Sequence, residues 1–339
     1  FLAAYFYLYS KMGDIISGLI ANGTAIAVAF KKYAFPAYYF GVGIAEHNLT
    51  YLLLYTVCTL AVFELVYAIL SRSFRQITTA KKGTARIKYK ERSMHVSSPA
   101  AALLRKDFRH FIGNPMYVLN AWMGEILLVV ACVAMLIKKD ILTEFLPILN
   151  GEGEIMGLIL CVILCGLSCT NLITAPSISL EGKNLWIAQS IPVPAATVLR
   201  AKVKLQMLLC IPITALSALL MGIVLKLELL TFVLAVLVPA AFNLFTALLG
   251  VVVNLHFPKF DYINETVVIK QSMSTMICMF GSMAVVLVLA LLYALLLSAS
   301  VAPTLFLAVC LVLLVIVCVL MWRYLGHGGS TRFAALQAD

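Results

Sequence analysis

Charged side chains are scarce in this chain of 339 residues, since Asp, Glu, Lys and Arg make up 12% of it against 63% hydrophobic residues. A soluble domain ordinarily carries about 25% charged and roughly 45–50% apolar residues. One globular core of this length cannot hide so much apolar surface, whereas a lipid bilayer accepts it directly. The composition therefore excludes a soluble fold and predicts an all-α, polytopic bundle of transmembrane helices.

Motifs of catalysis and nucleotide binding are also missing. The sequence has no Gly-x-x-x-x-Gly-Lys-Ser/Thr loop, so ATP cannot bind by that route, and no His-Glu-x-x-His or Gly-x-Ser-x-Gly. The nine cysteines lie in apolar runs, and even the regularly spaced Cys161, Cys165 and Cys169 have no nearby His or carboxylate to complete a metal site. We expect no catalytic residue, no metal, and cysteines that serve as small buried hydrophobes.

Seven apolar segments are long enough to cross a bilayer core about 30 Å thick, which takes about 20 helical residues. They are residues 50–71, 116–137, 155–175, 205–225, 229–252, 275–297 and 304–322. The chain begins without Met in an apolar run, residues 1–9, which we interpret as the end of an eighth span. The Gly- and Ala-rich residues 14–30 could be a re-entrant or surface helix and are not counted.

The basic residues predict the orientation, because cytoplasmic loops are enriched in Lys and Arg. Residues 72–115 hold eleven basic and two acidic residues, so this stretch is assigned to the cytoplasm and the other loops alternate. Nineteen of the 25 basic residues then lie beside an anionic leaflet, which explains the net charge of +10 without nucleic acid. We expect a multi-pass protein of the plasma (inner) membrane with a cytoplasmic C-terminus.

One hydrophilic stretch divides the chain into two parts. Residues 1–71 are expected to end an upstream transmembrane half with an external segment, and residues 72–98 to form a basic cytoplasmic linker. Residues 99–339 then hold an amphipathic helix at 99–113, six spans between 116 and 322, and a cytoplasmic tail.

The amphipathic helix is predicted from its cap and its two faces. Ser98 can cap it, and Pro99 suits its first turn. One face is apolar and the other basic, with Leu104, Phe108, Phe111 and Ile112 on the first and Arg105, Lys106, Arg109 and His110 on the second. Such a helix lies in the headgroup plane, either as a simple anchor or as a lever that also touches a cytoplasmic partner.

The loop at residues 176–204 carries apolar side chains although it cannot span the membrane. Leu180, Leu185, Trp186 and Ile187 are expected to be covered, because exposed apolar side chains on a loop imply a contact. That contact is either the protein's own helices and the headgroup zone or a docked partner.

Two acids, Glu64 and Glu125, fall within predicted spans. An ionisable group at membrane depth is by default a functional hypothesis, because its exposure to lipid costs several kcal/mol. The alternative is a hydrogen-bonded group that holds neighbouring helices together. A relay through these acids would make the protein an ion- or proton-coupled secondary transporter.

Three segments resemble bacterial ABC-2 type exporter permeases. They are Asn114-Pro-Met-Tyr-Val-Leu-Asn120 with the helix before it, Ser179-Leu-Glu-Gly-Lys-Asn-Leu-Trp-Ile-Ala-Gln-Ser-Ile-Pro-Val193, and the tail Leu325-Gly-His-Gly-Gly-Ser-Thr-Arg-Phe-Ala-Ala-Leu336. The resemblance covers about residues 70–339. Gln189 and Leu180 depart from it, since that family commonly has a basic residue at the first position and a basic or polar one at the second.

The resemblance implies a six-span permease half of an ATP-driven exporter, with an upstream half before it and an unidentified substrate. A separate cytoplasmic ABC ATPase subunit would hold ATP and Mg, so this chain would not be an enzyme. The ATPase would dock on a coupling loop formed by Glu181, Gly182, Lys183, Asn184, Leu185, Trp186 and Ile187. Of these, Leu185, Trp186 and Ile187 would be the apolar knobs of the contact.

Overall fold

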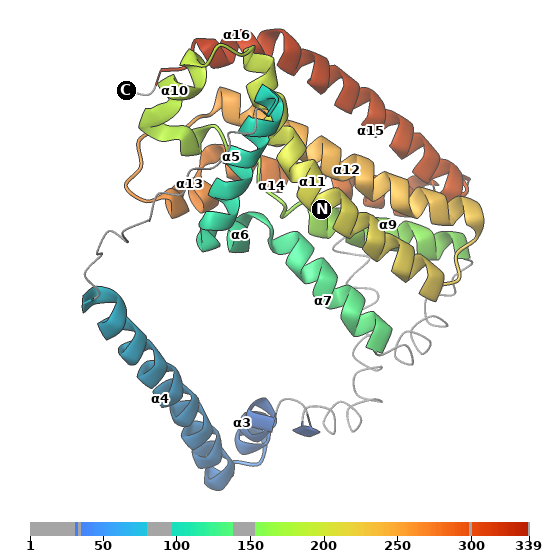
Figure 1. Cartoon of the computed structure of the whole chain (residues 1–339). Coiled ribbons are helices and arrows are strands. Elements are labelled where there is room, and N and C mark those ends of the chain that lie inside the picture. Colours follow the sequence, from blue (N-terminus) through green and yellow to red (C-terminus); the bar gives the residue numbers. More distant parts are fainter. Residues whose placement is uncertain (1–30, 33–34, 80–96, 138–152, 298–299, 338–339) are drawn as a thin grey trace. The chain divides into compact units, whose positions relative to one another are not determined.

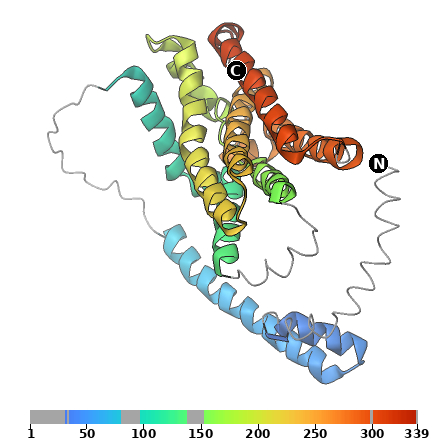
Figure 2. The same ribbon diagram turned by 90° about the vertical axis from the view of Figure 1, so that its right-hand side faces the viewer.

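The structure, a computed structural model, describes residues 31–32, 35–79, 97–137, 153–297 and 300–337. Every regular element among them is a helix, which confirms the all-α prediction (Figure 1, Figure 2). The chain divides into two compact units, Phe1–Ser93 and Met94–Asp339. The expected span end at 1–9, the stretch 14–30 and most of the linker at 72–98 lie outside the described residues.

The first unit contains a helical hairpin. Helix α3 (Phe35–Ala45) is followed after a short turn by α4 (Leu49–Thr79), and the two pack together. Asn48 precedes α4 and its Oδ1 accepts a hydrogen bond from the Thr50 amide at 3.0 Å, which satisfies a free donor of the first turn. The part of α4 from Leu49 to Phe74 is long and apolar enough to cross a membrane.

The second unit begins with the helix that the sequence predicts at 99–113. In α5 (Pro99–Gly113), Ser98 accepts the Ala101 amide at 3.3 Å, and Pro99 occupies the first turn, where its missing N–H breaks no bond. The helices that follow are α6 (Pro115–Ala121), α7 (Met123–Ile137), α9 (Gly153–Ser168), η1 (Ser179–Asn184), α10 (Leu185–Ser190), α11 (Ala195–Val224), α12 (Leu229–His256), α13 (Glu265–Gln271), α14 (Met273–Leu292), η2 (Tyr293–Leu297), α15 (Pro303–Gly326) and α16 (Gly328–Ala334).

In the part of the second unit that the structure describes, four helical segments are long enough to span a membrane, where the sequence predicts six. They are Ala195–Val224, Leu229–His256, Glu265–Leu295 and Pro303–Gly326. The other two predicted positions hold shorter apolar helices, Met123–Ile137 and Ile155–Ser168. The span predicted at 116–137 is thus broken at Trp122, the helix predicted at 155–175 ends at Ser168, and the six-span arrangement is not confirmed.

A backbone exchange explains the break before α7 and the early end of α9. In an unbroken helix the Glu125 amide would donate to the Ala121 carbonyl. Instead, the Glu125 amide donates to Asn171 Oδ1 at 3.2 Å, and the Ala121 carbonyl accepts from the Leu172 amide at 2.8 Å. The chain after α9 thus inserts between α6 and α7, and the helix breaks at Trp122.

Helix α12 lies at the centre of the second unit, where it contacts α9, α11, α14 and α15 (Figure 1, Figure 2). Helix α11, its main neighbour, begins at Ala195 rather than near the predicted residue 205. Arg200, Lys202 and Lys204 are therefore helical residues beside the core and not members of a loop.

Candidate functional site

A cluster of four charged side chains joins three elements of the second unit. Glu181 of η1 accepts hydrogen bonds from Lys202 of α11 at 2.8 Å and from Lys106 of α5 at 2.7 and 2.8 Å. Lys202 Nζ also donates to the Ser177 carbonyl at 3.0 Å and lies 3.6 Å from Asp107 Oδ2. We call Lys106, Asp107, Glu181 and Lys202 the ion cluster.

Lys202, Asp107 and Glu181 are largely shielded from water, whereas Lys106 is half exposed at the edge of the cluster. The Lys202 side chain is 3% exposed, and a buried cation of this kind needs compensating carboxylates. Burial alone would raise the pKa of Glu181, but the charges of Lys202 and Lys106 and their hydrogen bonds outweigh it and lower that pKa to about 2. Glu181 is therefore ionised at any physiological pH.

Buried polar contacts fix η1 in place beside the ion cluster. Asn254 of α12 accepts the Ile178 amide at 2.8 Å and the Ser179 amide at 3.1 Å, and its Nδ2 donates to Ser179 Oγ at 2.7 Å. Gly182 has a left-handed φ of 53°, and a Cβ there would lie 2.9 Å from Tyr262 Oη. Glycine at this position thus lets η1 turn close to the loop that carries Tyr262, which places Glu181 within hydrogen-bond distance of the two lysines.

Helix α10 follows η1 and presents an apolar tip. Trp186 is 63% exposed and Ile187 is exposed as well, whereas Leu185 is buried in the core. Leu185 is thus covered by the chain's own core, and Trp186 and Ile187 are the two predicted knobs that stay exposed. Gln189 Nε2 donates to the Phe333 carbonyl of α16 at 2.8 Å, so α10 is also fastened to the C-terminal helix.

The structure separates the predicted site residues into covered and exposed groups. In η1 and α10, Glu181 is half-buried and used inside the protein, Gly182 is buried, and Lys183 and Asn184 are exposed. In α5, the apolar face covers α11 and α6, with Phe111 buried, Leu104 and Phe108 half-buried, and Arg105, Lys106 and Arg109 exposed.

Sequence reasoning missed Lys202, Asp107 and Asn254 as members of this site. Lys202 was counted only as a basic loop residue, and Asp107 only as an acid on a basic stretch. An Asn near the end of an apolar span, such as Asn254, is a usable signal, because a polar side chain there needs a partner from another helix.

A second polar network surrounds Glu125, which is 1% exposed. Its Oε1 accepts from Asn171 Nδ2 at 2.9 Å and from Thr214 Oγ1 at 2.8 Å. Asn243 Nδ2 donates to Thr214 Oγ1 and to Ser168 Oγ, both at 3.0 Å. Four segments of the bundle thus meet at one buried carboxyl group, an arrangement suited to holding helices together.

Glu64 has no such surroundings. It lies on α4 of the first unit, and its side chain is exposed, as are most side chains along that part of the helix. Glu64 and Glu125 belong to different units.

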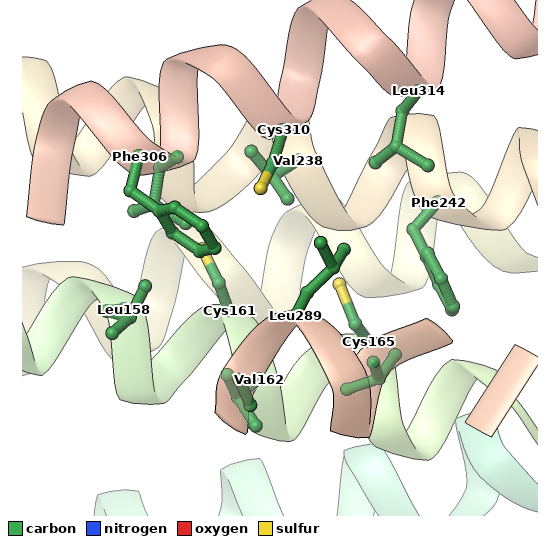
Figure 3. A pocket seen from close by; sticks show the side chains of 13 residues that line it. Leu158, Cys161, Val162, Cys165, Val238, Phe242, Leu289, Phe306, Cys310 and Leu314 are labelled. Carbon is green, nitrogen blue, oxygen red and sulfur yellow. The ribbon is translucent and has the colours of Figure 1, made fainter. Parts of the chain in front are cut away.

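An apolar pocket contains three of the cysteines. Its lining comes from α9, α12, α14 and α15, and Cys161, Cys165 and Cys310 all border it (Figure 3). The cavity volume is about 60 Å³. Within the described residues no cluster of His, Cys, Asp and Glu could hold a metal ion, and eight of the nine free thiols are buried.

The protein family described as "Putative ATP-binding cassette" matches residues 15–323. The chain belongs to this family. The matched region is also the region that holds nearly all of the five candidate spans. No curated protein and no solved structure matches the chain.

This membership overturns what the resemblance to ABC-2 exporter permeases implies. The family is one of ATP-binding cassettes, not of ABC-2 permeases, and it points to ATP binding and hydrolysis in this chain. The expectations that the chain has no nucleotide site, is not an enzyme and leaves ATP and Mg to a partner are therefore contradicted. The alternative of an ion- or proton-coupled secondary transporter is contradicted as well, since such a transporter does not use ATP.

The described residues do not fit a nucleoside triphosphate. The usual cradle is a glycine-rich loop between a strand and a helix, and the described part of the chain has no strand and only Gly182 as a glycine of positive φ. The buried lysine of the ion cluster already neutralises carboxylates, and the cavity beside it has a volume of about 20 Å³, room for a water molecule. No step of nucleotide chemistry is therefore assigned to these residues.

Proposed function

We propose that the chain is a membrane-embedded protein of an ATP-driven ABC transport system, and that the ion cluster passes movement from the α10 tip to the spans. The observation that carries this proposal is the bonding of Glu181 to both Lys106 and Lys202. Family membership supplies the link to ATP, and the candidate spans supply the link to the membrane.

The ion cluster is suited to this role because it connects a surface feature to long helices. Trp186 and Ile187 stand exposed on α10, directly after the η1 helix that carries Glu181. Lys202 belongs to α11, which continues as a candidate span to Val224. A push on the α10 tip would therefore displace α11 through the buried Glu181–Lys202 pair, since breaking a buried ion pair costs about 3–5 kcal/mol. Helix α5 would follow because Asp107 lies beside the same lysine.

The proposal includes an orientation in the plasma (inner) membrane. The basic residues Arg200, Lys202 and Arg323 lie at the same end of the second unit as the α10 tip, and we place this end, with the C-terminus, in the cytoplasm. Helices α7 and α9 are then counted as two short spans, which makes six in the second unit.

Chemical labelling of the α10 tip tests the proposal. In membranes that contain the complete transport system, Ile187→Cys should react with a membrane-impermeant maleimide only from the cytoplasmic side. Mg-ATP should slow this reaction at least threefold, because we expect the α10 tip to be buried in a contact while the transport system hydrolyses ATP. Ile263→Cys, at a fully exposed position on the loop between α12 and α13, is the control and should react at one rate throughout.

Two results would count against the proposed function. One is an Ile187→Cys labelling rate that Mg-ATP leaves unchanged in a preparation that is hydrolysing ATP. The other is labelling from the exterior alone. Unmodified protein gives the background reaction of its nine native thiols.

A further inference from the structure

A groove runs along the outside of the bundle between α12 and α15, which lie side by side (Figure 1). Ala241, Leu244 and Leu248 line one wall, and Val315 and Val319 line the other. The groove has a volume of about 260 Å³ and extends for two turns of each helix, roughly 10 Å. Val315 and Val319 are 47% and 48% exposed, so the groove is open on its outer side.

One arginine lines the polar end of this groove, and a second lies against Trp322, which also lines it. Arg323 is one of the lining residues, and the guanidinium of Arg200 lies over the Trp322 ring, 5.0 Å from its centroid. Arg200 Nε is buried and donates to no partner, and none of the ion pairs in the described residues involves either arginine. Arg200 as a whole is only partly buried, so its other N–H groups are open to an anion that approaches from outside the protein.

Gly326 makes room for this arrangement. A Cβ at Gly326 would lie 3.0 Å from Arg200 Nη2 and would push the guanidinium away from α15. The C-terminal end of α15 carries a partial negative charge, which attracts the Arg200 guanidinium. The other N–H groups of this guanidinium stay free to bind an anion.

The groove and the arginines lie at the depths that a phospholipid requires. Trp322 and Arg323 are in the last turn of the candidate span Pro303–Gly326, where Trp and basic residues meet the headgroups. The apolar walls lie farther into the span, at the depth of the acyl chains. Two unpaired guanidiniums above an apolar groove are complementary to a phosphate above a hydrocarbon chain.

We propose that the α12–α15 groove is a binding site for an anionic phospholipid, with one acyl chain between Leu244 and Val319 and the phosphate on Arg200 and Arg323. The net charge of +2 at the mouth selects a headgroup with a net negative charge over a zwitterionic one. This site is separate from the ion cluster, in which every charge already has a partner.

Lipid retention by the purified full chain tests this site. The protein is equilibrated with phosphatidylglycerol and phosphatidylcholine of equal chain length, and the bound lipids are counted by native mass spectrometry. The unmodified protein should retain phosphatidylglycerol at least fivefold over phosphatidylcholine. The double variant Arg200→Gln/Arg323→Gln should bring this preference below twofold, and Val319→Trp, which fills the groove, should lower retention of both lipids.

Matched controls separate the groove from general surface effects. Arg109→Gln removes an exposed arginine of α5, and Leu313→Trp adds the same bulk to an exposed position of α15 that does not line the groove. Both should behave as the unmodified protein does. Three results would overturn the proposal: a preference that survives the double variant, an equal loss in either control, or displacement of the preference by inorganic phosphate, which would make the ligand a free anion.

Discussion

Removing the charge of Lys202 should destabilise the second unit more than removing the charge of any exposed lysine. In Lys202→Met, the apolar stem stays but Glu181 and Asp107 lose their buried cation, and the Ser177 carbonyl loses its donor. Leaving buried carboxylates uncompensated costs about 3–5 kcal/mol, although Lys106 still faces Glu181 and moderates the loss. We therefore expect a loss near 3 kcal/mol.

Thermal unfolding in detergent measures this loss. For a unit of this size, 1 kcal/mol corresponds to about 2–4 °C in Tm, so Lys202→Met should melt about 6–12 °C below the unmodified protein. Lys106→Met is the matched control, because the Lys106 side chain is 50% exposed and its pairing should contribute about 1 kcal/mol or less. Equal Tm losses in the two variants would refute the argument that burial makes Lys202 the centre of the cluster.

Three further predictions follow from named contacts. The pKa of Glu181 is lowered from 4.5 to about 2, so ionised Glu181 stabilises the fold fully above pH 4.5 and loses this effect as the pH falls toward 2. The free energy of unfolding should fall by about 3 kcal/mol over this range. Unfolding measured against pH should show this change in the unmodified protein and not in Glu181→Gln. Glu125→Ala removes the shared acceptor of Asn171 and Thr214, which leaves Thr214 only the Cys210 carbonyl at 3.0 Å and Asn171 only a long 3.4 Å bond to Asn243. This loss should cost about 2 kcal/mol in thermal unfolding, whereas Glu125→Gln keeps an acceptor and should cost less than half as much. Equal losses would contradict the network. Gly250→Ala should lower the free energy of unfolding by about 1–3 kcal/mol, because its Cβ collides with the Thr174 side chain and comes within 2.9 Å of the Ala175 backbone nitrogen. The control Gly166→Ala, with open space around it, should be neutral or stabilising. An unchanged Tm for Gly250→Ala would show that α12 can move away.

The resemblance to ABC-2 permeases illustrates how far short motifs can mislead. It rested on loop and helix segments such as Glu181-Gly-Lys183, and the family match over residues 15–323 corrects the assignment to the ATP-binding cassette family. The segment Glu181-Gly-Lys183 still has a structural role, because Gly182 adopts a positive φ and Glu181 accepts hydrogen bonds from Lys106 and Lys202.

The sequence alone determined the properties that depend on composition and on near neighbours along the chain. The shortage of charge predicts an all-helical protein with apolar helices long enough to span a membrane. The helix at Pro99–Gly113 could be placed to the residue, because Ser98 and Pro99 begin it through bonds made within one turn.

Only the tertiary structure decided the features whose partners are distant in sequence. The break at Trp122 follows from Asn171 and Leu172, which take over the hydrogen bonds of a continuous helix. Lys202 could not be recognised as buried until α5 and η1 brought Asp107 and Glu181 to it. Local pattern cannot encode such choices, since a buried polar group is stable only where another segment supplies its partner.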